Sequence, residues 1–169
     1  MKIKSLHIAL VLFLFSGCID IEDPSNIPEI KYKNHQVSYC EDNLGNENKC
    51  IDLSFELRDG DGNMGLLDSD TIPPFTGIYK HNFYYNLWVY KGGDFHLWDG
   101  LAINYFDIPY IVPQGQNKIL IADVSIDLSF STSTLPYDTM MLSFYVYDRD
   151  LNQSNIENTD TIIFQQNQP

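Results

Sequence analysis

An unbroken alternation of apolar and polar side chains runs through residues 51–58, Ile51-Asp52-Leu53-Ser54-Phe55-Glu56-Leu57-Arg58. Successive side chains of an extended chain point to opposite faces, so this stretch places its four apolar residues on one face. A period of two indicates a β-strand with one buried face and does not fit the 3.6-residue spacing of an amphipathic helix. The stretch therefore predicts a strand of a sheet that packs against a second layer.

The same alternation recurs along the chain, and no stretch beyond residue 18 has an apolar stripe at helical spacing. Further strands are expected at residues 86–90, 95–98, 119–130, 142–147 and 161–164. Lys91-Gly92-Gly93-Asp94 is typical of a tight hairpin turn between the first two of these. Strands separated by Pro, Gly and Asn turns predict an all-β fold, an antiparallel immunoglobulin-like β-sandwich of about seven to nine strands. An open barrel is the alternative.

The first 17 residues have the organisation of an export signal. Lys2 and Lys4 precede an apolar run at residues 8–15. That run is too short for a membrane-spanning helix, which needs about 20 apolar residues. It ends in Phe15-Ser16-Gly17-Cys18, which resembles the bacterial lipobox, so we expect cleavage before Cys18 and lipidation of its thiol. The alternative is an ordinary secretory signal that contains a cysteine.

The sequence predicts a signal peptide at 1–17, a lipidated cysteine with an acidic tether at 18–29 and a β-sandwich domain at 30–169. The tether has two prolines, four acidic residues and no periodicity. Acidic residues behind a lipidated cysteine resemble the surface-export signal of Bacteroidota lipoproteins. We therefore expect a lipid-anchored protein of the outer membrane, either on the cell surface or, if the tether is only a solvated linker, facing the periplasm.

The formal net charge of the chain is −13. Nucleic acids and anionic lipid surfaces bind clustered Lys and Arg side chains, so this charge argues against both as partners. The expected partners are the membrane through the lipid anchor, and an envelope protein or a glycan.

Two cysteines, Cys40 and Cys50, form an even pair once Cys18 is lipidated. Exported chains enter oxidising compartments, where such pairs form disulfides. Asn and Gly residues between the two cysteines mark a hairpin turn, so we expect a disulfide across a hairpin. Two reduced cysteines on neighbouring strands are the alternative.

An acidic loop at residues 59–70 follows the strand at 51–58. It begins with the D-x-D-x-N spacing of a calcium loop, and Gly60 and Gly62 let the chain curl so that alternate oxygen ligands converge. The candidate calcium ligands are Asp59, Asp61, Asn63, Asp68 and Asp70. Met64 stands where helix–loop–helix calcium sites require glycine, so tight turns without metal are the alternative.

A second acidic turn ends a similar strand later in the chain. Residues 53–63 and 142–152 share Leu-Ser-Phe, an aliphatic residue two positions further on, and D-x-D-x-N. If the two strands run in the same direction, both turns lie at one end of the sandwich, where they share a metal site or form two. The second set of candidate ligands is Asp148, Asp150 and Asn152.

These motifs resemble a family of small Bacteroidota lipoproteins with an immunoglobulin-like β domain. The resemblance is carried by residues 59–66, by Ile108-Pro109 with Pro113 and 115–118, by 148–149 with 152–155, and by 159–164. It implies the fold and an envelope location. Members of the family largely lack an assigned activity, so the resemblance implies no catalytic residue.

Three functions are compatible with these observations. The first is a non-enzymatic envelope lipoprotein whose β-sandwich is stabilised by calcium and binds or scaffolds a partner. The second is a carbohydrate-binding module of an outer-membrane glycan-uptake system, with Trp88 and Trp98 stacking on sugars if both are exposed on one flat face. The third is a glycosidase-type enzyme, which the sequence disfavours because it contains neither G-x-S-x-G nor H-E-x-x-H.

Overall fold

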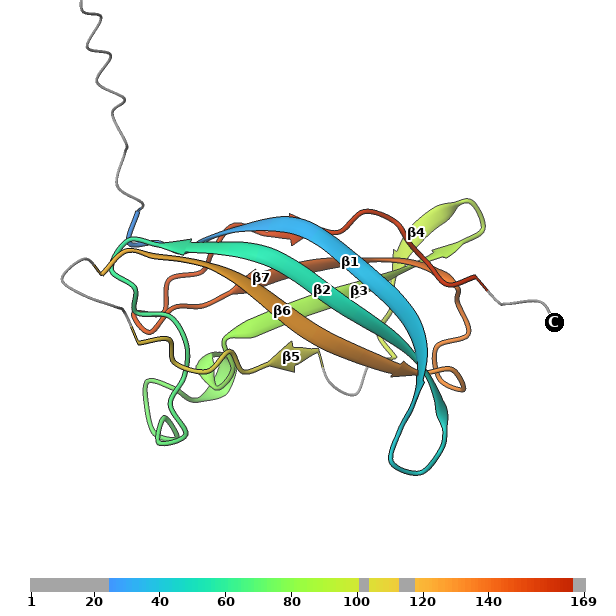
Figure 1. Ribbon diagram of the computed structural model, residues 1–169, viewed down its shortest axis with the longest axis horizontal. Coiled ribbons are helices and arrows are strands. Elements are labelled where there is room, and N and C mark those ends of the chain that lie inside the picture. Colours follow the sequence, from blue (N-terminus) through green and yellow to red (C-terminus); the bar gives the residue numbers. More distant parts are fainter. Residues whose placement is uncertain (1–24, 101–103, 113–117, 166–169) are drawn as a thin grey trace, which may run out of the picture.

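The computed structural model describes residues 25–100, 104–112 and 118–165, and these residues form an all-β domain (Figure 1). The strands are β1 (Glu29–Glu41), β2 (Glu47–Asp59), β3 (Phe83–Lys91), β4 (Asp94–Leu97), β5 (Tyr105–Phe106), β6 (Leu120–Ser131), β7 (Thr139–Val146), β8 (Glu157–Asn158) and β9 (Ile162–Ile163), with a 3-10 turn η1 (Gly77–Tyr79). The predicted signal peptide, Cys18 and the tether before residue 25 lie outside the described residues.

The strands form two antiparallel sheets. One sheet has three strands in the order β1-β2-β6, which lie side by side in Figure 1. The other has six, in the order β4-β3-β7-β8, with β5 beside β3 and β9 beside β7. The prediction of an antiparallel β-sandwich with about seven to nine strands is confirmed.

The core lies between the inner faces of the two sheets. Every second residue of β2, from Ile51 to Leu57, is buried, as the alternation predicts. The Phe55 ring lies 5.8 Å from the Phe83 ring and 5.3 Å from the Phe144 ring, so aromatic packing joins the sheets. Burial of each such side chain contributes about 1.5–3 kcal/mol relative to its exposed state.

A buried charge lies at each end of the inner face of β2. At one end, Lys49 donates to the carbonyl oxygens of Leu135 and Tyr137 at 3.1 and 2.6 Å, and its Nζ lies 2.7 Å from a carboxylate oxygen of Asp138. At the other end lies Asp59, whose side chain is fully buried. The register of β2 thus brings one cation and one anion to opposite ends of the core.

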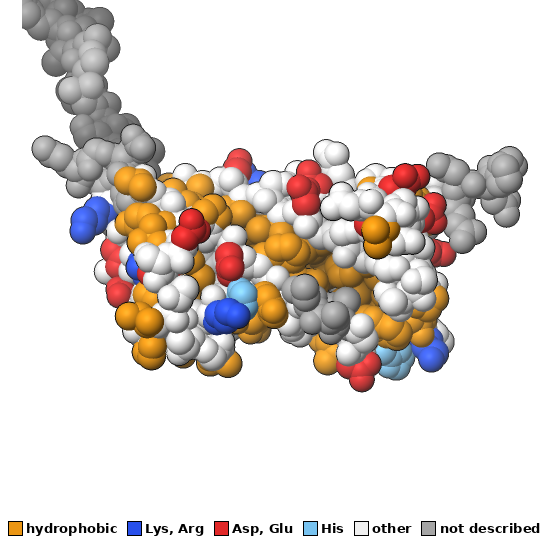
Figure 2. Space-filling model, turned by 90° about the horizontal axis from the view of Figure 1, so that it is seen from below, with side chains coloured by type: hydrophobic (Ala, Val, Ile, Leu, Met, Phe, Trp, Pro, Cys, Tyr) orange, Lys and Arg blue, Asp and Glu red, His pale blue; other side chains and the backbone are white. Residues whose placement is uncertain are grey.

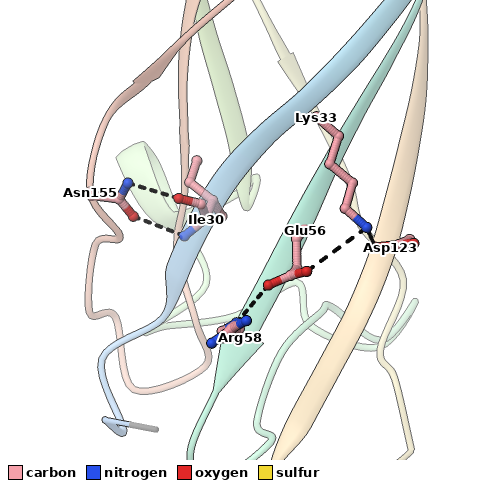
Figure 3. Close-up of polar contacts among 6 residues, drawn as sticks. All are labelled: Ile30, Lys33, Glu56, Arg58, Asp123 and Asn155. Carbon is pink, nitrogen blue, oxygen red and sulfur yellow. Dashed lines mark hydrogen bonds and ion pairs between the residues drawn. The ribbon is translucent and has the colours of Figure 1, made fainter.

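One edge of the sandwich is closed by side chains that imitate a strand. The carboxamide of Asn155 accepts a hydrogen bond from the Ile30 amide and donates one to the Ile30 carbonyl, both at 2.8 Å (Figure 3). The Tyr32 amide donates to Glu157 at 3.1 Å. These bonds join β1 to Asn155, between β7 and β8, and to Glu157 of β8, and they satisfy backbone groups that an open edge would leave unpaired.

The predicted disulfide between Cys40 and Cys50 is present, with 6.0 Å between their Cα atoms. It joins β1 to β2 near their hairpin turn. Within the described ranges, no helix is long and apolar enough to cross a membrane.

Candidate functional site

The two acidic turns lie together at one end of the sandwich, as their similar strand ends predict. The Asn63 side-chain amide donates to Asp150 at 3.0 Å, and the Asn63 backbone carbonyl accepts from the Arg149 amide at 3.3 Å. The chain from the tether enters at the same end, since the Gly60 amide donates to the Ser25 carbonyl at 2.8 Å. This end therefore combines a strand end from each sheet with the start of the domain.

Asp59 is the most unusual group of this acidic end. Its side chain is 0% exposed, and one carboxylate oxygen accepts from the Asn63 amide at 2.9 Å. The other oxygen, Oδ1, has no hydrogen-bond donor among the described residues. Burial, followed by the negative charges of Asp61 and Asp148, raises the pKa of Asp59 to about 6. An ionised Asp59 is therefore poorly compensated, and a proton or a cation would stabilise it.

Asp148 is buried as well, but its carboxylate is satisfied. Its two oxygens accept from the backbone amide and the side-chain amide of Asn152, at 2.7 and 2.8 Å. Burial raises the pKa of Asp148, and the hydrogen bonds from Asn152 oppose that rise. This geometry is that of an aspartate that builds its own turn.

Two further predicted ligands have other surroundings: Asp70 pairs with Arg149, and Asp68 is exposed. Asp70 pairs with the Arg149 guanidinium through contacts of 2.5 and 3.2 Å, which lowers the pKa of Asp70, and it accepts from the Leu67 amide. Asp68 is exposed beside a hollow of about 400 Å³. In the part of the chain that the structure describes, no three His, Cys, Asp or Glu side chains form a group placed to hold a metal ion. Calcium binding at these residues stays a prediction.

The two residues after Asn63 determine the course of the loop. Met64 is fully buried in the core, and Gly65 has a φ of +96°. A Cβ on Gly65 would lie 2.2 Å from the Pro109 carbonyl oxygen, so only glycine allows this approach. Hydrogen bonds of Leu66 with the Ile108 carbonyl and the Tyr110 amide, both 2.9 Å, then hold the chain beside residues 108–110.

The two tryptophans lie on opposite faces of the six-stranded sheet. Trp88 pairs with Leu97 across the β3–β4 hairpin, whereas the Trp98 amide donates to the carbonyl of the inward-facing Leu87 at 2.8 Å. Trp98 therefore packs against the core and lines a hollow of about 450 Å³ between the sheets. Hydrophobic side chains gather along the side of the molecule seen in Figure 2. The two indoles cannot form one flat stacking surface.

The outer face of the six-stranded sheet instead presents aromatic and uncharged side chains in cross-strand rows. The first row is Tyr105, Tyr84 and Tyr145; the second is Asn86, Ser143 and Asn158; the third is Leu97, Trp88 and Met141. The Tyr84 and Tyr145 rings stack at 5.7 Å, and the Tyr147 ring meets Tyr145 edge-on at 5.6 Å. We call these three rows the aromatic face.

The outer face of the three-stranded sheet is of the opposite kind. Lys33 lies between Asp123 and Glu56, at 2.5 and 3.8 Å, and Arg58 contacts Glu56 at 2.6 Å (Figure 3). These charged side chains stand on three neighbouring strands and are solvated. The two outer faces of one sandwich thus differ sharply in charge.

Comparisons with known proteins identify no relative of this chain. No protein-family model matches the chain, and neither does any curated protein or solved structure. The resemblance to small Bacteroidota lipoproteins therefore stays a prediction, and the argument for function rests on the residues themselves.

Proposed function

We propose that this protein is a non-enzymatic binding module, held at the outer membrane by a lipid on Cys18, and that the aromatic face is its binding surface. One observation carries the proposal. The chain has a net charge of −13, yet the three rows of the aromatic face contain no charged side chain. Exposed apolar surface of this kind marks binding sites on soluble domains.

Strand propensity alone does not account for the aromatic face. Aromatic residues favour strands in general, yet the outward-facing positions of β2 and β6 carry Glu56, Arg58 and Asp123. Trp88 and Tyr145 keep partial exposure where a charged or small polar side chain would keep the protein more soluble. A binding role gives a physical reason for the difference.

The proposal includes a calcium ion at the acidic end, held by Asp59 and Asp61. Asp59 Oδ1 supports it, because this buried oxygen has no donor among the described residues. Calcium also accepts carbonyl and water oxygens, so two carboxylates can suffice in part of its shell. Such an ion would stabilise the junction of the two sheets at the end where the tether enters, and leave the aromatic face free.

The test of the binding function is retention of the lipid-free domain, residues 19–169, on Gram-negative outer-membrane preparations. We expect saturable binding that Trp88→Ala and Tyr145→Ser weaken at least about tenfold, which corresponds to about 1.4 kcal/mol. The matched control is Lys33→Ala, on the outer face of the other sheet, with no expected effect. Binding that is lost equally in the control, or no saturable binding, would contradict the proposal.

A further inference from the structure

We infer that the ligand of the aromatic face is a neutral glycan, and that Trp88, Asn86 and Asn158 form the centre of its binding site. The inference rests on the proposed binding function and names its ligand class. It arises from the register of β3, β7 and β8, which places a row of polar side chains between the row of tyrosines and the row that contains Trp88.

The Trp88 indole is positioned as a platform. Its Nε1 donates to Ser143 Oγ at 3.1 Å, and Ser143 lies on the neighbouring strand β7, opposite Asn86 rather than opposite Trp88. The ring therefore reaches diagonally over the sheet, and its outward face stays partly exposed. The negative face of an aromatic ring attracts the slightly positive C–H groups that line one side of a pyranose ring.

The polar row supplies groups that recognise hydroxyls. Asn86 and Asn158 flank Ser143 on its two sides, and both side chains are exposed. Within the described chain, neither carboxamide makes a hydrogen bond. Each carboxamide offers two donors and one acceptor oxygen, a combination that matches pairs of sugar hydroxyls. A sugar stacked on Trp88 would lie one row, about 7 Å along the strands, from the amide row, in which Asn158 is two strands, about 10 Å, across the sheet from Asn86.

The charge of the site selects a neutral sugar. The three rows contain no Asp, Glu, Lys, Arg or His, so an anionic sugar would find no cation among them, and the net charge of −13 would repel it.

A protein partner fits the aromatic face less well. Stable protein interfaces have a dry apolar centre and a polar rim. Here the amide row is central, and the exposed aliphatic side chains Leu97 and Ile163 belong to the peripheral strands β4 and β9. A polar centre between ring systems is the arrangement that a polyhydroxylated ligand requires.

The first experiment is calorimetric titration of residues 19–169 with neutral hexasaccharides of glucose, mannose, xylose and N-acetylglucosamine. We expect at least one to bind, with Trp88→Ala and Asn86→Ala each weakening binding about tenfold or more. Trp98→Phe, on the other face of the sheet, is the matched control and should bind as the wild type does. Unchanged thermal unfolding midpoints would show that the variants are folded.

The second arm uses the outer-membrane preparations and decides the outcome if none of these sugars binds. Periodate, which cleaves sugar diols, should abolish retention of the domain, whereas protease digestion of the preparation should leave it intact. Retention that survives periodate and is lost on digestion would overturn the glycan inference while the binding function stands. If the domain is not retained at all, the proposed function fails together with the inference.

Discussion

Asp59→Asn should stabilise this protein at neutral pH in the absence of calcium, although it removes a buried carboxylate at a strand end. The variant keeps an oxygen that can accept from the Asn63 amide, as Asp59 does at 2.9 Å. Its new amide group occupies the place of Oδ1, which has no donor among the described residues, and the substitution removes the charge repulsion between Asp59 and Asp61. The substitution thus replaces an acceptor oxygen that has no donor with a group that can donate a hydrogen bond.

The size of the effect follows from the pKa of Asp59, which burial and neighbouring carboxylates raise from 3.8 to about 6. The folded state holds this proton more tightly than the unfolded state, so stability is lost as pH rises from about 4 to about 6 and stays reduced above that range. A shift of about two pKa units corresponds to about 3 kcal/mol. A domain of this size shifts its midpoint by about 2–4 °C per kcal/mol, so the gain at pH 8 is at most about 12 °C.

The assay is thermal unfolding of wild type and Asp59→Asn in excess chelator at pH 4.5 and pH 8, with Asp127→Asn, an exposed carboxylate on β6, as control. The variant should be markedly more stable at pH 8, and the difference should shrink at pH 4.5. If Asp59→Asn is no more stable than wild type at pH 8, the carboxylate is compensated and the electrostatic reasoning is refuted.

Adding calcium to the same assay separates a metal site from plain turns. A site with a Kd of about 10 µM in 1 mM calcium stabilises wild type by about 2.7 kcal/mol, and the variant, which lacks the carboxylate, should gain little. In calcium, the unfolding midpoint of wild type should therefore equal or exceed that of Asp59→Asn. A wild-type midpoint that does not respond to calcium would remove calcium from the proposal.

Three further variants test the stability of the sandwich by urea titration. Cys40→Ser combined with Cys50→Ser should lower the free energy of unfolding by about 3 kcal/mol, because the disulfide closes a loop with a sequence separation of 10; no loss would show that the loop is ordered without it. Gly65→Ala should cost more than about 2 kcal/mol, since φ is +96° and a Cβ meets backbone at 2.2 Å, and a neutral result would refute that close approach. Lys49→Met should cost about 2 kcal/mol, because two carbonyls and Asp138 lose their donor, unless water replaces it.

Local patterns in the sequence predicted the buried faces of the strands and the position of the acidic turns. The alternation at 51–58 specified the buried face of β2, and the similar strand ends predicted the meeting of the two acidic turns. β1 was harder to predict, because Lys33-Asn34-His35-Gln36 interrupts the alternation where the register slips between Tyr32 and Asn34. Pairing with β2 makes this polar stretch a strand, and pairing is a non-local property.

The candidate sites depended on longer-range contacts. The pairing of Asp70 with Arg149, the burial of Met64 and the close approach of Gly65 to Pro109 cannot be predicted from the spacing of residues in the loop. The sequence does indicate that Trp88 and Trp98 lie on opposite faces of the sheet. A two-residue Gly92-Gly93 turn pairs Trp88 with Leu97, so the next residue, Trp98, points to the other face. The aromatic face needed the register of β3 with β7, which brings Asn86 opposite Ser143.

The most direct test of the aromatic face as the binding surface uses Trp88 as its own reporter. The chain has two tryptophans, so Trp98→Phe leaves Trp88 as the single indole. Addition of outer-membrane preparations should shift and shield Trp88 emission, saturating along with retention of the domain. The domain could instead be retained in a saturable way while Trp88 emission and its quenching by iodide stay unchanged. That result would show that binding does not involve the aromatic face and would contradict the proposal.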